Sequence, residues 1–277
     1  MDLSIVIVTH NHAPYLAACL KSLQPARERL DMEVIVVDNC STDGSADLVR
    51  QHMPDARLIV NERRHGFAAN NNSGMRLAKG DFILLLNPDT EVLGDALPTL
   101  VAFMRAHPEA GVCGAQLRFP DGTVQPSCRR FPSVWSVLAR RTFLRHYLWN
   151  SPLNRHHLML EQNHNQIQEV DWMLGACLLA SREAIADVGM MDEGYFLYVE
   201  DIDWCYRMHL RGWKVFYVPS ARIIHHHLAV TDQRWLTRRT LMHYRGMARF
   251  ARKHYFPLRW RVATREADRN AAATRNV

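Results

Sequence analysis

Short apolar runs alternate with helical patterns up to about residue 115. The runs are rich in Val, Ile and Leu without regular polar interruption, which is typical of strands buried on both faces of a parallel sheet. They occupy residues 3–8, 33–37, 57–60 and 82–86. Helical spacing of apolar residues is found at residues 13–23, 41–52, 67–78 and 95–105. This alternation predicts an α/β fold with a doubly wound, mostly parallel central sheet.

The alternation fades after residue 115. The segment 120–122, Pro-Asp-Gly, predicts a hairpin turn, and residues 129–168 are typical of loops. Further strands are predicted at residues 170–180, 214–218 and 222–224, and further helices at residues 200–211 and 231–255. We therefore expect one domain over residues 1–230, with halves 1–115 and 116–230, followed by a helical extension over residues 231–277.

The composition is that of an ordinary globular protein, with 48% apolar and 22% charged residues. No stretch approaches the roughly 18 uncharged apolar residues of a membrane span. The chain starts MDLSIVIVTH, with an acid where a signal peptide carries positive charge, so we interpret it as mature structure. Six scattered cysteines with no C-x-x-C pair predict free, buried thiols in a reducing compartment. These features favour a cytoplasmic protein.

Positive charge is concentrated in two segments. Residues 129–160 contain six arginines and no acid, and residues 234–265 contain ten Lys or Arg and no acid. The remainder of the chain is acidic, although the whole chain carries a net charge of +6. Such a split indicates a polyanionic partner or a membrane surface rather than a generic solvated face.

Polar residues stand at the carboxyl ends of the predicted strands, where sheets of this class bind ligands. These ends read His10-Asn11, Asp38-Asn39 and Asn87-Pro88-Asp89. No G-x-G-x-x-G or G-x-x-x-x-G-K-[ST] loop is present to hold phosphates, so a metal or basic side chains must compensate their charge. Asp89 is a hard oxygen ligand of the kind that binds Mg²⁺ or Mn²⁺. On its own, however, this tripeptide fits a plain turn better.

Three acids, Glu200, Asp201 and Asp203, open the predicted helix over residues 200–211 beside several aromatic residues. They fit the ordinary preference of acids for a helix N-terminus. They also fit a general base, because crowding and desolvation raise the pKa of a carboxyl group. Strand alternation would place His225 and His227 on one face, where one of them completes a metal shell with Asp89. A polar strand end is the alternative.

Four segments of the chain, in order and at plausible spacing, resemble the family 2 glycosyltransferases of the GT-A fold. Within that family they are most similar to the rhamnosyltransferase-like branch. The segments are residues 4–23, 34–45, 66–90 and 172–226. The resemblance covers nearly everything from residue 3 to about residue 231. It implies a nucleotide-sugar-binding first half and an acceptor-binding, catalytic second half.

The resemblance also implies roles for single residues. Thr9 and Asp38 would contact the pyrimidine base and ribose of a dTDP- or UDP-sugar donor. The implied donor-site residues are Thr9, Asn11, Asp38, Asn72 and Asn87. Asp89 would bind the Mg²⁺ or Mn²⁺ that bridges the donor diphosphate, although Asn87 replaces the first acid of the usual D-x-D motif.

At the other side of the implied site, Asp201 would be the catalytic base, with Glu200 beside it. His225 would be the later metal or diphosphate ligand, with His227 as its rival. The implied reaction is an inverting transfer of rhamnose, or of a hexose, to a glycan or lipid-diphosphate-linked saccharide acceptor in cell-surface polysaccharide synthesis.

Other functions fit the sequence less well. A nucleotidyltransferase needs a basic, glycine-rich loop after the first strand, and the chain has none there. A non-catalytic scaffold subunit has no need of the acids at the strand ends. No nucleic-acid-binding module is recognisable. The basic, aromatic extension predicts peripheral attachment to an anionic, cytoplasmic membrane surface, with a solvated helix packed on the domain as the alternative.

Overall fold

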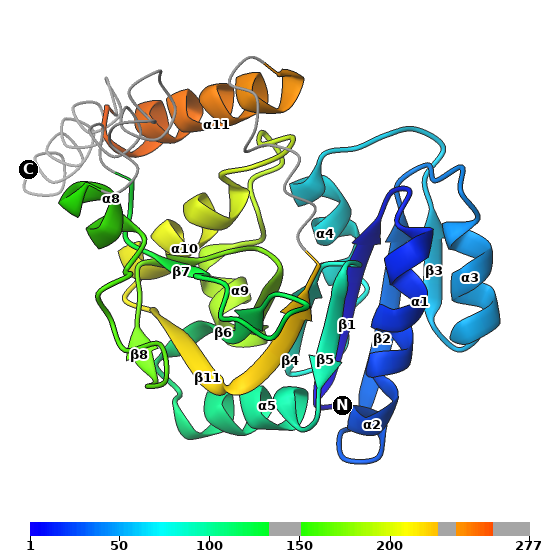
Figure 1. Ribbon diagram of the computed structural model, residues 1–277. Coiled ribbons are helices and arrows are strands. Elements are labelled where there is room, and N and C mark those ends of the chain that lie inside the picture. Colours follow the sequence, from blue (N-terminus) through cyan, green and yellow to red (C-terminus); the bar gives the residue numbers. More distant parts are fainter. Residues whose placement is uncertain (133–150, 227–236, 257–277) are drawn as a thin grey trace, which may run out of the picture.

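The computed structural model describes residues 1–132, 151–226 and 237–256 (Figure 1). The first part of the chain alternates strands and helices as the apolar pattern predicts. Its elements are β1 (Leu3–Thr9), α1 (Ala13–Ser22), α2 (Gln24–Arg27), β2 (Met32–Asp38), α3 (Ser45–His52), β3 (Arg57–Val60), α4 (Phe67–Met75) and β4 (Phe82–Leu86). All residues of β1 and β4 are buried, which explains their continuous apolar sequence.

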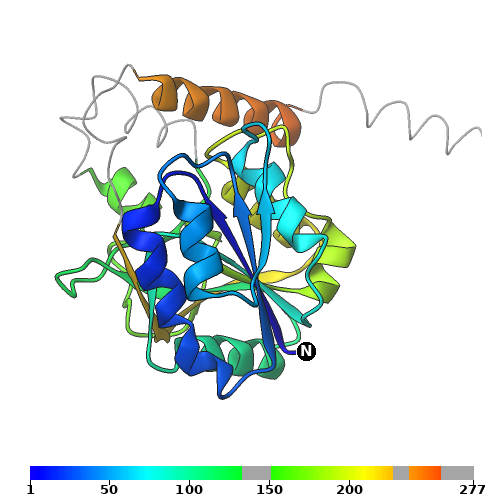
Figure 2. The same cartoon turned by 90° about the vertical axis from the view of Figure 1, so that its right-hand side faces the viewer.

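These four strands form the parallel half of the sheet, in the order β3-β2-β1-β4. Side chains of β1 alternate between two cores: Ile5 packs with Leu16 of α1, and Val6 packs with Met75 of α4. Figure 2 shows α1 and α3 on one face of the sheet and α4 on the other. Because the register places Thr9 opposite Asp38, the polar ends of β1 and β2 lie side by side.

The second part of the chain extends the same sheet with mixed strand directions. Its elements are β5 (Thr90–Leu93), α5 (Ala96–Ala106), β6 (Ala110–Arg118), β7 (Cys128–Arg129), α8 (Pro152–His157), β8 (Gln168–Glu169), β9 (Trp172–Met173), β10 (Cys177–Ser181), α9 (Arg182–Val188), α10 (Glu200–Leu210), β11 (Lys214–His225) and α11 (Arg238–His254). The order continues β4-β10-β6-β11-β5, with β10 antiparallel to both of its neighbours. The predicted α/β class and its parallel core are confirmed.

Two strand predictions are wrong in detail. The segments 214–218 and 222–224 belong to one strand, β11, which stays paired with β6 through a bulge between Val218 and Arg222. Pro219 lies in this bulge, where a missing backbone N–H breaks no ladder. The segment predicted as a strand over residues 170–180 is divided into β9 and β10. The hairpin turn at 120–122 is confirmed, because the Phe119 N–H donates to the Thr123 carbonyl at 2.9 Å.

Helix α11, the described part of the extension, lies across the end of the sheet where β1 and β2 finish (Figures 1 and 2). Lys253 Nζ contacts Asp203 at 2.9 Å and Asp192 at 2.8 Å, which ties this helix to the domain. Gly246 packs on the residues before α10, since a Cβ there would meet Val199 Cγ2 at 2.9 Å. No helix in the described ranges is long and apolar enough to cross a membrane. The six cysteines are free, as expected.

Candidate active site

Thr9 and Asp38 present buried polar atoms at the neighbouring ends of β1 and β2. Thr9 is 0% exposed and Asp38 is 1% exposed. Asp38 Oδ1 accepts a hydrogen bond of 2.7 Å from the Ser41 N–H. Asp38 Oδ2 and Thr9 Oγ1, however, have no hydrogen-bond partner among the described residues. Because buried polar atoms are normally paired, these two atoms fit hydrogen bonds to a polar ligand at the strand ends.

Asn11 and Asn72 hold backbone segments in place. Asn11 Oδ1 accepts from the Thr42 N–H at 2.8 Å, which joins the loops after β1 and β2. Asn72 lies on α4, where its Nδ2 donates to the Met191 carbonyl at 2.8 Å and its Oδ1 accepts from the Met191 N–H at 3.1 Å. Both residues therefore shape the site through the backbone, and their direct contact with a donor stays a prediction.

Asp89 and His225 face each other at the end of β4 and β11. Asp89 Oδ1 and His225 Nε2 are 3.6 Å apart, and both side chains are largely buried. On its other side, His225 Nδ1 contacts Gln125 Oε1 at 2.9 Å. A carbonyl oxygen cannot donate, so His225 Nδ1 donates to Gln125, and Nε2 is the ring nitrogen that faces the Asp89 carboxylate. Two electron-pair donors that converge in this way fit a cation between them.

The charge around Asp89 stabilises its anionic form. Burial alone would raise the pKa of Asp89, but hydrogen bonding and charge from His225, together with His12, bring the pKa below its ordinary value. Neither Gln125 nor His12 was singled out from the sequence. Gln125 could not be found by a local pattern, because it meets His225 across a separation of 100 residues. His12 lies in the segment that carried the family resemblance.

Glu200 and Asp201 begin helix α10 after an unusual stretch of backbone. Tyr198 and Val199 both have left-handed backbone conformations, with φ of 71° and 74°. Such conformations are costly for residues other than glycine and are typical of functional sites. Asp201 Oδ1 accepts from the Ile202 N–H at 2.9 Å and Asp201 Oδ2 accepts from the Gly175 N–H at 3.1 Å, so the carboxylate is fixed in orientation.

The two carboxyl groups have raised pKa values. Burial is the main cause for both. It raises the pKa of Asp201 to about 6, although backbone hydrogen bonds and the Arg129 charge oppose it. The pKa of Glu200 rises well above its usual range, because this side chain is more deeply buried and the Asp201 charge adds to the effect. Asp201 remains partly exposed, so it is the carboxylate that a substrate can reach.

Arg129 is a third residue that the sequence analysis did not single out. It lies on β7, paired with Trp172 of β9, and its charge stabilises the anionic form of Asp201. Burial lowers the pKa of Arg129 to about 10, so it stays positively charged at neutral pH. It came from the arginine-rich segment 129–160, and that clustering was the only signal for it in the sequence.

The segment Gly175-Ala176 connects Asp201 to the turn that presents Asp89. The Gly175 N–H holds Asp201, while the neighbouring Ala176 carbonyl accepts a hydrogen bond of 3.0 Å from the Asn87 N–H. Asn87 begins the turn that presents Asp89. The backbone therefore brings the end of β4 and the start of α10 to the same place. These contacts also explain the interruption of the predicted strand over residues 170–180.

The remaining candidates lie beside this centre. His226 Nε2 contacts Glu91 Oε1 at 2.6 Å on the neighbouring strand β5. His227, the rival of His225, lies outside the described residues. Asp203, the third acid of α10, is fully buried and contacts Tyr195, Arg207, Lys253 and His254. Burial alone would raise its pKa, but these basic partners hold the pKa of Asp203 far below its usual range, so it acts as a structural anion.

The residues around Asp89 fit a metal that also binds the substrate. In the part of the chain that the structure describes, no three His, Cys, Asp or Glu side chains form a ready metal cluster. Asp89 and His225 supply two ligands. Mg²⁺ and Mn²⁺ sites commonly use one or two protein ligands and complete their shell with phosphate oxygens and water. The pair therefore fits a divalent ion that arrives with a diphosphate.

Comparison with protein families identifies the chain. The model of "Glycosyl transferase family 2" matches residues 4–171, which is more than half of the sequence. The chain belongs to this family. Its matched region contains the ends of β1, β2 and β4 with their polar residues.

Two relatives of this family 2 glycosyltransferase are rhamnosyltransferases. It is 33% identical over 240 residues to an N-acetylglucosaminyl-diphospho-decaprenol L-rhamnosyltransferase of Mycobacterium tuberculosis, covering 81% of this chain and 76% of that protein. It is 30% identical over 230 residues to rhamnosyltransferase WbbL of Escherichia coli, covering 80% and 82%. These relatives confirm the rhamnosyltransferase resemblance that the sequence motifs carried.

Solved structures confirm the GT-A fold. The glycosyltransferase resembles GalNAc-T7 bound to UDP, GalNAc and Mn²⁺ with a TM-score of 0.60 and 20% identity, over 81% of this chain and 44% of that one. It also resembles a mannosyltransferase from Pyrobaculum calidifontis bound to GDP-Man and Mn²⁺, with a TM-score of 0.59 and 19% identity, over 83% and 58%. At such low identity these neighbours support the fold and not a particular substrate.

Proposed function

We propose that this glycosyltransferase moves rhamnose from dTDP-rhamnose to a saccharide carried on a lipid diphosphate, with inversion at the anomeric carbon. The two rhamnosyltransferase relatives support the choice of sugar, and the name of one of them specifies a lipid-diphosphate acceptor. A UDP-hexose is the second donor class. The observation that carries the proposal is the Gly175-Ala176 segment, which holds Asp201 beside the turn that presents Asp89.

In the proposed reaction, Asp201 takes the proton of an acceptor hydroxyl group. The oxygen then forms a bond to the anomeric carbon while the bond from that carbon to the donor diphosphate breaks, and the diphosphate leaves with the electron pair. A carboxylate with a pKa of about 6 is suited to this role, because it is ionised at neutral pH yet more basic than an ordinary Asp. Thr9 and Asp38 would hold the nucleoside of the donor.

Asp89 and His225 would hold a divalent ion against the donor diphosphate. When bound, such an ion supplies Lewis-acid stabilisation of the leaving group. The pair contains one carboxylate oxygen and one imidazole nitrogen, and nitrogen is a softer ligand than oxygen. We therefore expect Mn²⁺ to support activity better than Mg²⁺.

We further propose that the extension attaches the enzyme to the cytoplasmic face of a membrane, where a lipid-linked acceptor resides. The outer side of α11 exposes basic residues together with large apolar ones. The exposed apolar residues are Leu241 and Tyr244 of the helix, and Tyr255 and Phe256 directly after it. Basic residues near anionic lipid and aromatic residues at the interface both favour such attachment. Co-sedimentation with phosphatidylglycerol vesicles tests it, and no binding at low salt would refute it.

The transfer reaction itself can be tested with purified protein, Mn²⁺ and N-acetylglucosaminyl diphosphate on a short prenyl chain. Donors are dTDP-rhamnose, UDP-glucose and UDP-N-acetylglucosamine, and mass spectrometry detects the product. We expect transfer from dTDP-rhamnose, abolished or strongly reduced in Asp89→Ala and unchanged in Asp187→Asn, which alters an exposed acid of α9. Absence of both transfer and donor hydrolysis with every sugar nucleotide would refute the proposal and favour a scaffold role.

A further inference from the structure

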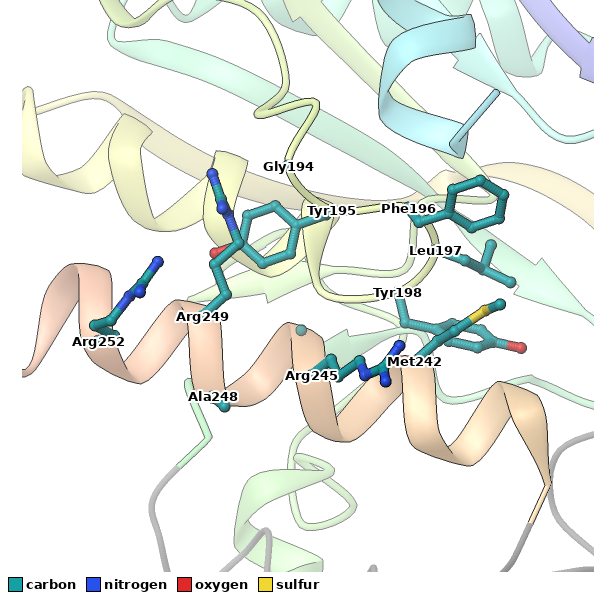
Figure 3. A pocket seen from close by; sticks show the side chains of 11 residues that line it. Gly194, Tyr195, Phe196, Leu197, Tyr198, Met242, Arg245, Ala248, Arg249 and Arg252 are labelled. Carbon is teal, nitrogen blue, oxygen red and sulfur yellow. The ribbon is translucent and has the colours of Figure 1, made fainter. Parts of the chain in front are cut away.

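A cavity lies apart from Asp89 and Asp201, neither of which lines it. It measures about 670 Å³ and lies between the loop 194–198 and helix α11. We call it the α11 pocket. Figure 3 shows the loop along one side and arginine side chains of the helix along the other. Its volume is within the roughly 300–1,000 Å³ of typical small-molecule sites, so it can hold more than a single phosphate.

The lining of the α11 pocket is cationic and aromatic. Its charged and aromatic side chains are Tyr195, Phe196, Tyr198, Arg245, Arg249 and Arg252, and no acid lines it. Arg245 and Arg252 form no ion pair with any acid in the described ranges. Guanidinium groups bind phosphate oxygens in a two-pronged geometry, and aromatic faces pack against sugars or apolar chains. This combination fits a phosphate-bearing ligand with a non-polar or sugar portion.

Arg249 differs from the other two arginines, because it already has partners. Its Nη2 contacts Asp192 at 2.9 Å, and its guanidinium lies 5.3 Å from the centre of the Tyr195 ring. Figure 3 shows it beside Tyr195. Its guanidinium also packs on Gly194, where an added Cβ would overlap the guanidinium carbon and displace Arg249. Arg249 thus builds the wall of the pocket, and Arg245 and Arg252 are left to bind a ligand.

The pocket adjoins the proposed catalytic base. Gly246, next to Arg245, packs on Tyr198 and Val199, since a Cβ at this glycine would meet the Tyr198 carbonyl oxygen at 3.2 Å. Asp201 follows Val199 by two residues. A ligand in the pocket therefore lies beside the left-handed stretch that positions Asp201. The pocket and the proposed base are thus connected through residues 198–201.

In the proposed reaction the donor diphosphate does not occupy the α11 pocket. It is held by Asp89 and His225, which are connected to Asp201 through the Gly175-Ala176 segment and not through α11. The acceptor must approach the anomeric carbon from the side opposite the leaving diphosphate. A second anionic group that enters next to Asp201 therefore belongs to the acceptor.

We propose that the α11 pocket binds the diphosphate of the lipid-linked acceptor, with Arg245 and Arg252 as its ligands. This inference rests on the proposed function. The acceptor sugar then reaches Asp201 from the pocket, and the lipid chain leaves along the exposed apolar side of α11, past Tyr244 and Tyr255. The acceptor class is thus selected by its diphosphate as well as by its sugar.

The test compares two acceptors in solution without vesicles: N-acetylglucosaminyl diphosphate on a short prenyl chain, and octyl N-acetylglucosaminide, which lacks the diphosphate. The double variant Arg245→Ala/Arg252→Ala is compared with Arg238→Ala, an exposed arginine of the same helix outside the pocket. We expect the double variant to raise KM for the diphosphate acceptor by about 100-fold or more, since one charge-assisted hydrogen bond contributes a factor of roughly 10–100. Donor dissociation constants should stay unchanged.

Three results would overturn the proposal. One is an unchanged KM for the diphosphate acceptor, and another is an equal loss with both acceptors. The third is a loss of vesicle binding alone, which would assign the arginines to lipid headgroups. If the wild-type protein transfers no sugar, the proposed function fails by itself. The α11 pocket is then tested separately by calorimetric titration with inorganic pyrophosphate in EDTA. If the pocket binds anions, pyrophosphate binding is lost in the double variant.

Discussion

Substitution of Asp201 by Asn should change both the pH dependence of stability and the catalytic rate, because both depend on ionisation of this carboxyl group. The pKa of Asp201 is raised from 3.8 to about 6 by burial. A raised carboxyl pKa means that the folded protein favours the protonated form, so stability from this group is present at low pH and is lost as pH rises through 6. Between pH 5 and pH 8 the loss from this one group is about 1.4 kcal/mol.

The variant Asp201→Asn lacks this titration. Asn offers one oxygen, so either the Gly175 or the Ile202 N–H loses its acceptor, at a cost of about 1–3 kcal/mol at every pH. The difference in Tm between wild type and variant should therefore shift by about 3–5 °C in favour of the variant between pH 5 and pH 8. Arg129 stays charged in both proteins. Glu200 loses the Asp201 charge in the variant, so its pKa is less raised there, which adds to the shift in favour of the variant.

Differential scanning calorimetry at the two pH values measures this shift, with Asp187→Asn as the matched control that should show none. In the transfer assay, wild-type kcat/KM should rise with pH around a midpoint of about 6. The Asn variant should lose a factor of about 10²–10⁴ in kcat. A pH-independent Tm difference, together with normal turnover in the variant, would refute the assignment of Asp201 as a desolvated base.

Two further changes test how the site is built. Asp203→Ala should destabilise the protein by about 3 kcal/mol or more, because it leaves Arg207 and Lys253 without their buried partner, and chemical denaturation measures this loss. Asp203→Asn, which keeps the size, should lose less. Gly66→Ala should displace the loop before α10, since its Cβ would meet Phe196 Cα at 2.9 Å. We expect reduced kcat with the fold retained by circular dichroism, and full activity would contradict the contact.

The parallel half of the fold could be predicted from the sequence because strands buried on both faces have continuous apolar sequences. β4, which is buried throughout, has the predicted bounds Phe82–Leu86. β3 also has its predicted bounds, Arg57–Val60, although it is a partly exposed edge strand. The bulge in β11 could not be predicted in this way. Pro219 and the polar residue after it have the local pattern of a strand end, and only the pairing with β6 on both sides of the bulge makes one strand of the two segments.

The acids at the start of α10 show a second limit of prediction from the sequence. Glu200, Asp201 and Asp203 lie within four positions, and the sequence alone gives no physical reason to separate them. In the structure, basic residues from α10 itself and from α11 surround Asp203, whereas Asp201 meets backbone N–H groups and stays partly exposed. Their opposite pKa shifts depend on contacts across some 50 residues, and only the family resemblance pointed to Asp201 beforehand.

The Gly175-Ala176 segment has a consequence for how such an enzyme can diversify. It sets the spacing between Asp201, the proposed base, and the turn that presents Asp89 with two backbone hydrogen bonds, one from Gly175 to Asp201 and one from Asn87 to Ala176. Every amino acid except proline carries the same backbone donor and acceptor, so side-chain replacements elsewhere leave this spacing intact. Elements proposed to bind the acceptor, such as α11, can therefore be exchanged between relatives as separate modules while the spacing of Asp201 and Asp89 is retained.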